Sequence, residues 1–259
     1  MSTPITTELV KELRDKTGIS VMQCRRALVE AEGDMKTALA ILKKTSASIA
    51  EKKGDREAND GAVAIFAQDK KNVLVALHCE TDFVSRNEDF TTLLSALGEK
   101  ALNEGAEKMK TVAKEMIDPV IQKTGENIKL GEVYEVTGEV LGNYVHNNKI
   151  AVIVSLSGGD ESLARDLAMH IAAMKPEYIT EEEINADAKE TITEVFKKEV
   201  ASVDKPEEIK KKMLEGKIAT YFKEKTLTHQ EFIKDSSVTI SQLLDRAKAT
   251  IKEVKRYSI

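Results

Sequence analysis

The chain has 259 residues, of which 41% are hydrophobic and 32% charged, a composition typical of a folded globular protein and not of a disordered one. The formal net charge of −5 and the aromatic content of 4% disfavour a general nucleic-acid binder that works by charge or by base stacking. No apolar run approaches the roughly 20 residues of a membrane span, and no signal peptide is evident. The two cysteines, Cys24 and Cys79, are far apart, which favours a reduced, cytoplasmic protein.

Residues 6 to about 44 are predicted to form three short helices joined by tight turns. Gly18 suits the end of the first helix, Ser20 begins a capping-box pattern for the second, and Asp34 can cap the third. Apolar residues recur at helical spacing in each segment, as expected for a small bundle. Taken alone, such a bundle could be a free-standing adaptor, a nucleic-acid binder or a docking domain.

Residues 46–60 are small and charged without a sustained apolar face, which is typical of a linker, and the first half of this linker could be helical. Two runs rich in β-formers follow and predict a hairpin over residues 61–84. Two helices, about 86–104 and 107–123, complete a first core half at 61–130. Pro119 lies near the end of the second helix and marks a kink or a boundary there.

The second strand of this hairpin leads into an acidic and aromatic corner, Glu80-Thr81-Asp82-Phe83-Val84. The residues that follow are a plausible helix start. A large aromatic residue at a strand-to-helix corner is either a buried core plug or an exposed wedge, and the residue pattern leaves both open.

The hairpin-then-helix order then occurs a second time. Strands are predicted over Glu132–Gly142 and Tyr144–Leu156, with a turn at Asn147-Asn148, and a helix over 161–175. The expected fold class is therefore α+β, with a core of two similar halves, each an antiparallel sheet covered by helices. The second half takes in residues 131–179 and 226–259.

Residues 180–225 are predicted to form two charge-rich helices separated at Pro206. Together these helices would make an antiparallel helical-hairpin arm inserted in the second half. The high charge favours projection into solvent over packing onto the core. No covalent chemistry is indicated: Gly158-Gly159 lacks the Lys and Ser/Thr of a phosphate-binding loop, and no cysteine or histidine spacing suits a metal. We expect a protein that is not an enzyme and needs neither cofactor nor bound metal.

Several stretches closely resemble the elongation factor Ts family, the nucleotide-exchange partners of the translational GTPase elongation factor Tu. They are LRDKTGISVMQCRRALVEAEGDMKTAL, TDFV, LGNYVHNNKIAVIVSL and LARDLAMHIAAMKPEYI, and the resemblance covers essentially the whole chain. It implies a ubiquitin-associated-like bundle at residues 1–45 that docks on the GTPase and a coiled-coil arm at 180–225. Some members carry a further C-terminal helix after the last strand. This sequence stops at Ile259, so we expect exchange not to depend on that helix.

The resemblance also implies site residues. The residues implied to disturb the magnesium and phosphate site of elongation factor Tu are Thr81, Asp82, Phe83 and Val84. Docking positions that match the family are Lys11, Arg14, Val21 and Met22. Val21 stands where many relatives have Met, and Met22 is read equally well as a core residue or a contact residue. His146, at the predicted turn, matches a contact near the phosphate-binding loop of the partner.

The function that the resemblance implies is exchange without covalent chemistry. The chain would bind elongation factor Tu with GDP or without nucleotide, release GDP, and be displaced by GTP. The resemblance also allows a dimer of two such heterodimers, and it implies neither a direct nucleic-acid partner nor a membrane. Two other classes stay open: a scaffold or chaperone-like binder that uses the bundle and the arm, and an RNA-binding role, which the net charge disfavours.

Overall fold

The computed structural model describes residues 4–259 and divides into two compact units. The first unit holds the described residues up to Thr137, together with Val145–Ile153 and Lys255–Ile259. The second unit holds Gly138–Tyr144 and Val154–Val254. Helices and antiparallel sheets occur together along the chain, which confirms the predicted α+β class.

The chain begins with three helices, α1 (Thr7–Thr17), α2 (Val21–Glu30) and α3 (Met35–Lys53). Local chemistry sets their ends as predicted: Gly18 adopts a left-handed φ of 65° after α1, and Ser20 and Asp34 accept hydrogen bonds from the first turns of α2 and α3. Leu13 and Leu28 are fully buried among the residues that these helices share as a core.

α3 continues through residues 46–53, the first half of the predicted linker, and residues 54–59 lie in neither helix nor strand. Its C-terminal half lies along α6 (Ala106–Thr124) in the first unit. Lys43 pairs with Glu115 at 2.6 Å, and the Ser46 hydroxyl donates a hydrogen bond to Gln122. The stretch that is free of regular structure is therefore much shorter than 46–60.

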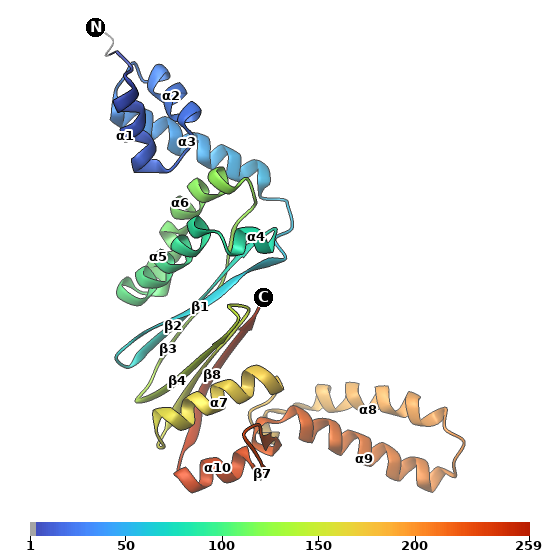
Figure 1. Cartoon of the computed structure of the whole chain (residues 1–259). Coiled ribbons are helices and arrows are strands. Elements are labelled where there is room, and N and C mark those ends of the chain that lie inside the picture. The colour runs from blue at the N-terminus through green and yellow to red at the C-terminus, as the bar shows by residue number, and fades with distance from the viewer. Residues whose placement is uncertain (1–3) are drawn as a thin grey trace. The chain divides into compact units, whose positions relative to one another are not determined.

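The first sheet has the order β1-β2-β3, with β1 (Asp60–Gln68), β2 (Lys71–Cys79) and β3 (Lys129–Thr137) all antiparallel. α5 (Glu88–Glu104) and α6 lie side by side on one face of it (Figure 1). The helix α6 runs on through Pro119 and does not end there. Between sheet and helices lie fully buried residues, among them Val73, Val75, Leu77, Phe90, Leu97 and Met109.

The strand predicted over Glu132–Gly142 proves to be two strands. β3 ends at Thr137 and pairs with β2, and a new strand, β4 (Val140–His146), begins after Gly138 and Glu139. Residues 131–137 are thus hydrogen-bonded into the first sheet, although the sequence division placed them in the second core half.

The second sheet has the order β4-β5-β8, with β5 at Ile150–Ser157 and β8 at Thr250–Ser258. The turn between β4 and β5 is formed by Asn147 and Asn148, whose φ values of 50° and 55° suit the tight hairpin turn that was predicted. α7 (Glu161–Met174) and α10 (Ile240–Ala247) follow in the second unit.

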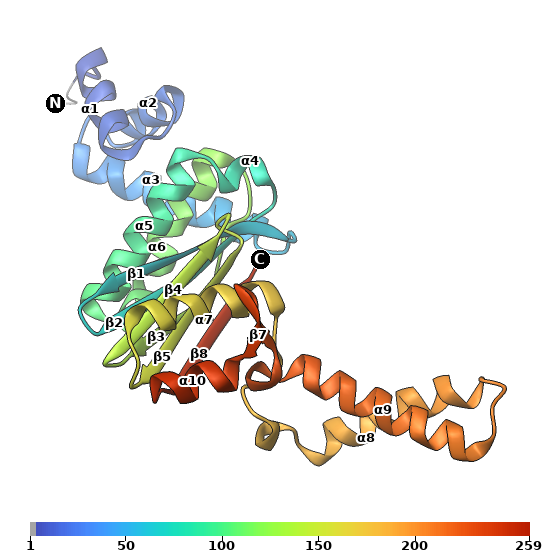
Figure 2. The same ribbon diagram turned by 60° about the horizontal axis from the view of Figure 1, so that its bottom comes forward.

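The arm is a pair of helices, α8 (Ala186–Ala201) and α9 (Glu207–Lys225), which lie side by side and away from α7 and α10 (Figure 2). Pro206 precedes the first residue of α9, where its fixed φ is well suited. Four short elements around the arm were not predicted: two 3-10 turns at Glu181–Glu183 and Leu227–His229, and the two-stranded pair β6 (Glu231–Phe232) and β7 (Asp235–Thr239).

Candidate functional site

Residues Thr81–Val84 form an exposed tip where β2 gives way to the one-turn helix α4 (Asp82–Ser85). Thr81 is extended, with φ −133° and ψ 158°, and its hydroxyl accepts a hydrogen bond from the backbone N–H of Val84 at 3.4 Å. This is the capping geometry that threonine favours. The Phe83 side chain is 84% exposed. Of the two interpretations of this residue, the structure therefore supports the exposed one.

The residues beside Phe83 hold the tip in place. Val84 packs against the core beneath α5, and Ser85 is buried. Asp82 pairs with Arg86 at 3.2 Å on the outer side, an exposed ion pair that contributes little to stability. Phe83 is thus the apolar side chain of this turn that points away from the core.

Cys79 supports the tip from below. Its thiol donates a hydrogen bond to the carbonyl oxygen of Thr81 at 3.1 Å. Burial raises the pKa of the Cys79 thiol to about 12, and the nearby carboxylates of Asp60 and Glu126 add to the rise. Cys79 therefore stays protonated at neutral pH and acts as a hydrogen-bond donor, not as a reactive thiolate.

The turn that carries His146 is tied to the same end of the first sheet. The Lys149 ammonium donates to Asp60 at 2.7 Å and to the carbonyl oxygen of Gly61 at 2.6 Å. Burial works against the charge of Asp60, but the hydrogen bonds from Lys149 and from the Gly61 N–H hold its pKa below the ordinary value. Because Asp60 is the register partner of Cys79, the His146 turn and the tip lie at one end of this sheet.

The residues expected to dock on a partner lie on the N-terminal bundle. Met22 is 76% exposed and Val21 is 52% exposed at the start of α2, so neither is a core residue. Lys11 and Arg14 are exposed one turn apart on α1. These four residues thus come from α1 and α2, whereas the tip is formed by the end of β2 and by α4.

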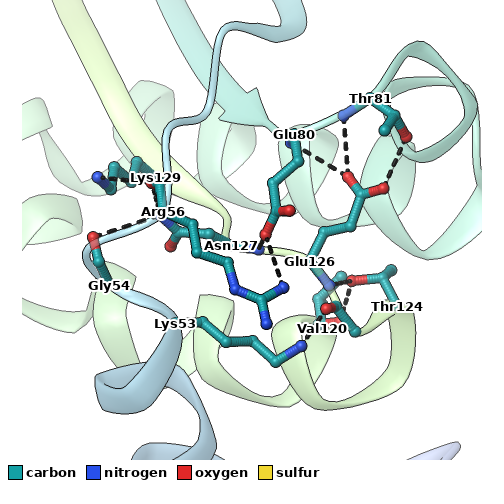
Figure 3. Close-up of polar contacts among 11 residues, drawn as sticks. Lys53, Gly54, Arg56, Glu80, Thr81, Val120, Thr124, Glu126, Asn127 and Lys129 are labelled. Carbon is teal, nitrogen blue, oxygen red and sulfur yellow. Dashed lines mark hydrogen bonds and ion pairs between the residues drawn. The ribbon is translucent and has the colours of Figure 1, made fainter.

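The base of the tip contains residues that the sequence did not single out. Glu126 contacts Glu80 and Thr81, and Asn127 contacts Glu80 and also Arg56 in the segment after α3 (Figure 3). Glu126 lies 45 residues from Thr81 along the chain, and local patterns do not report such pairings. The one local signal was Gly125, a typical helix-ending residue that precedes two polar ones.

Within residues 4–259, no group of three or more His, Cys, Asp or Glu side chains is placed to hold a metal ion. Over the same described part of the chain, every helix is too short or too polar to cross a lipid bilayer. Cys24 and Cys79 are both buried and form no disulfide.

Comparisons with known proteins show the family of the chain. Residues 80–259 match the family model described as elongation factor TS. The chain is 37% identical over 262 residues to elongation factor Ts of Hahella chejuensis, with 98% of this chain and 92% of that relative covered. It is 38% identical to the Cellvibrio japonicus protein (98% and 90% covered) and 36% identical to the Deinococcus radiodurans protein (97% and 98% covered), both named elongation factor Ts. The chain therefore belongs to the elongation factor Ts family, the nucleotide-exchange factors of translation elongation.

Proposed function

We propose that this chain is the exchange factor of an elongation factor Tu: it binds the GDP-loaded GTPase, promotes the loss of GDP, and leaves when GTP binds. Membership of the family supports the partner and the reaction. The observation that carries the mechanism is Phe83, an aromatic side chain that is 84% exposed on an anchored turn.

Phe83 acts as a wedge in this mechanism. Burying a phenylalanine side chain contributes about 1.5–3 kcal/mol, and in this protein that gain becomes available only when a partner covers the ring. The ring is stiff and large, so its entry between packed helices of the GTPase displaces them. Asp82 enters beside it, and its charge disturbs the polar groups around the magnesium ion of the partner. Thr81 and Val84 keep the turn in shape.

The remaining site residues bind without taking part in the displacement. His146 approaches the phosphate-binding loop of the partner from the same end of the sheet as the tip. Met22 and Val21 on α2 supply apolar contact, and Lys11 and Arg14 on α1 supply charge. Because coupling is reciprocal, a factor that weakens GDP binding is itself bound more weakly by the GDP form, and rebinding of nucleotide releases it.

The arm is the candidate surface for joining two such complexes. Val195 on α8 is 54% exposed and Ile209 on α9 is 46% exposed, although both are large apolar residues. A second copy of the complex would cover them. Light scattering of the purified complex, which reports its mass, distinguishes one heterodimer from two.

The test of exchange follows a fluorescent GDP analogue as it leaves elongation factor Tu. The analogue is loaded first, excess unlabelled GDP is added, and the chain is supplied at substoichiometric amounts. Acceleration over many turnovers supports the proposal. Binding without any acceleration would contradict it and would favour a scaffold.

The wedge is tested in the same assay with Phe83→Ala and Phe83→Leu. Loss of about 1.5–3 kcal/mol from burial corresponds to a roughly 10- to 150-fold slower release for the alanine variant. The leucine variant retains part of the apolar surface, so its rate of GDP release is expected to lie between those of the wild type and the alanine variant. Ile233→Ala, which truncates another large apolar side chain that is exposed (49%), serves as the matched control and keeps the wild-type rate. Wild-type exchange by folded Phe83→Ala would remove the wedge from the mechanism.

A further inference from the structure

Where β2 turns into the tip, one carboxylate accepts hydrogen bonds from two consecutive residues (Figure 3). Oε2 of Glu126 accepts hydrogen bonds from the backbone N–H of Glu80 at 3.1 Å and of Thr81 at 3.0 Å. Oε1 of the same side chain accepts a hydrogen bond from the Thr81 hydroxyl at 2.6 Å. Three donors from two consecutive residues thus converge on one side chain.

These two amides lie beyond the ladder hydrogen bonds of the sheet. The pairing of β1 with β2 ends at Cys79, and the pairing of β2 with β3 ends at His78. Backbone N–H groups at such a position need another acceptor. Water can satisfy them, but it leaves both peptide planes free to turn. A carboxylate that accepts from both planes and from the adjacent hydroxyl fixes their direction.

Glu126 is itself fixed by the residues on either side of it. Gly125 ends α6 in a left-handed conformation, with φ 78°. Asn127 is only 2% exposed, and its side chain donates to the carbonyl oxygen of Arg56 at 2.7 Å. The Asn127 N–H donates to the Glu80 carboxylate at 2.7 Å. The contacts therefore run both ways: Glu126 binds the backbone at residues 80–81, and Glu80 binds the backbone at residue 127 (Figure 3).

The direction of Phe83 depends on this anchor. Phe83 lies two residues after Thr81, in a helix of four residues. A single helical turn is too short to be stable by itself, so its direction comes from the residues that hold its ends. Ser85 anchors the C-terminal side of α4 by its burial, and the Thr81 cap anchors the other side.

We propose that Glu126 is a positioning residue for nucleotide exchange, which sets the direction of the Phe83 ring by fixing the backbone and the hydroxyl of Thr81. The inference rests on the exchange function proposed above. Glu126 does not touch the partner in this account, and it acts only through the tip.

Three variants test this role. Glu126→Ala removes both acceptor oxygens and with them all three hydrogen bonds, whereas Glu126→Gln retains an oxygen for the two amides and a group that can bond the hydroxyl of Thr81. Glu107→Ala removes a carboxylate of α6 whose side chain is 88% exposed and pairs only across one turn with Lys110, and it serves as the matched control. Release of the fluorescent GDP analogue from limiting elongation factor Tu is followed at increasing concentrations of each variant, which yields a maximal rate and a half-saturating concentration.

A loosened tip is expected to lower the maximal rate and to leave the half-saturating concentration unchanged, because the bundle contacts are intact. Freeing about one residue of backbone corresponds to a roughly 5- to 30-fold loss of rate in Glu126→Ala. Glu126→Gln restores most of the rate, and Glu107→Ala behaves as the wild type. A purely structural role predicts the opposite pattern: unfolded protein raises the half-saturating concentration and spares the maximal rate. That pattern, or a wild-type maximal rate in Glu126→Ala, overturns the proposal.

Hydrogen exchange of the Thr81 amide in the free chain provides a readout that does not depend on the partner. Glu126→Ala is expected to speed this exchange at least about tenfold, and Glu126→Gln to slow it again. Unchanged protection in Glu126→Ala overturns the proposal. If the wild-type chain does not accelerate GDP release, the proposed function fails. The exchange rate of the Thr81 amide would still show whether Glu126 orders the tip.

Discussion

Acidification below about pH 6.5 is expected to destabilise the second unit through one buried histidine, His170. The ring is fully buried on α7. Its Nε2 lies 2.8 Å from Oε1 of Gln230, whose amide group is oriented by a hydrogen bond from its Nε2 to the carbonyl oxygen of Glu224. The backbone N–H of Ile233 donates to Nδ1 of His170 at 3.2 Å. The neutral tautomer with the proton on Nε2 satisfies both contacts.

The protonated ring does not fit this site. A proton on Nδ1 would face the Ile233 N–H, so ionisation costs that hydrogen bond as well as the desolvation of a charge. Burial accordingly lowers the pKa of His170, against a smaller opposing effect of the Gln230 hydrogen bond. In the unfolded chain the pKa is about 6.5. Below that value the unfolded state binds the proton and the folded state does not, so stability falls as the pH falls.

The size of the effect follows from the same two states. One proton corresponds to a slope of at most about 1.4 kcal/mol per pH unit, so the free energy of unfolding should drop by up to about 1.4 kcal/mol between pH 7.5 and pH 5.5. Urea unfolding of the wild type and of His170→Gln, measured at both pH values, isolates this contribution because the other histidines are present in both proteins. A difference between wild type and variant that does not change with pH would refute the reasoning. So would an NMR titration in which His170 ionises at or above pH 6.5.

Three further perturbations probe the fold and the docking surface. Gly142→Ala should destabilise the second unit by about 1–3 kcal/mol or more in urea unfolding, because the new Cβ would lie 2.1 Å from the carbonyl carbon of Ala164; equal stability would contradict this close approach. Lys149→Met should reduce the loss of thermal stability that the wild type shows below about pH 4. The lowered pKa of Asp60 stabilises the folded state at pH values above the ordinary pKa of an aspartate, and this stabilisation is lost on acidification; an unchanged acid profile would exclude this ion pair as the cause. Met22→Ala should raise the half-saturating concentration in the exchange assay roughly 10- to 150-fold at an unchanged maximal rate, and a lowered maximal rate would place Met22 in the displacement step.

The elements that the sequence predicted well are those set by local chemistry. Gly18, Ser20 and Asp34 define helix ends by interactions within four residues, and the Asn147-Asn148 turn defines the β4–β5 hairpin by its backbone conformation alone. Local residue patterns did not predict whether Phe83 is exposed. A strand-to-helix corner carries the same residues whether its aromatic side chain faces the core or the solvent.

The features that were missed depend on long-range pairing. β3 pairs with β2, which lies about fifty residues earlier in the chain. The alternating pattern of β3 continues toward β4 without a clear break, because a single glycine such as Gly138 is also found at a bulge within one strand. The role of Glu126 likewise depends on the amides of Glu80 and Thr81, which lie next to it only in the folded chain. Polar residues after a helix end are common, and nothing local marks the one that orders a distant turn.

In the proposed mechanism, the docking residues of the bundle and the tip supply different parts of the exchange reaction. A ligand shifts an equilibrium only by the difference in its affinity for the two states. In that mechanism, contacts at Met22 on the N-terminal bundle bind the GTPase equally well with and without GDP, so they supply affinity and not exchange. The proposed wedge, Phe83, gains its burial only where the helices of the partner have moved, so it would stabilise the nucleotide-free state of the complex. An anchored tip is needed for this, because a mobile Phe83 could be buried without moving anything. The separation of docking from displacement thus explains why Met22→Ala and Glu126→Ala are expected to change different kinetic parameters of one reaction.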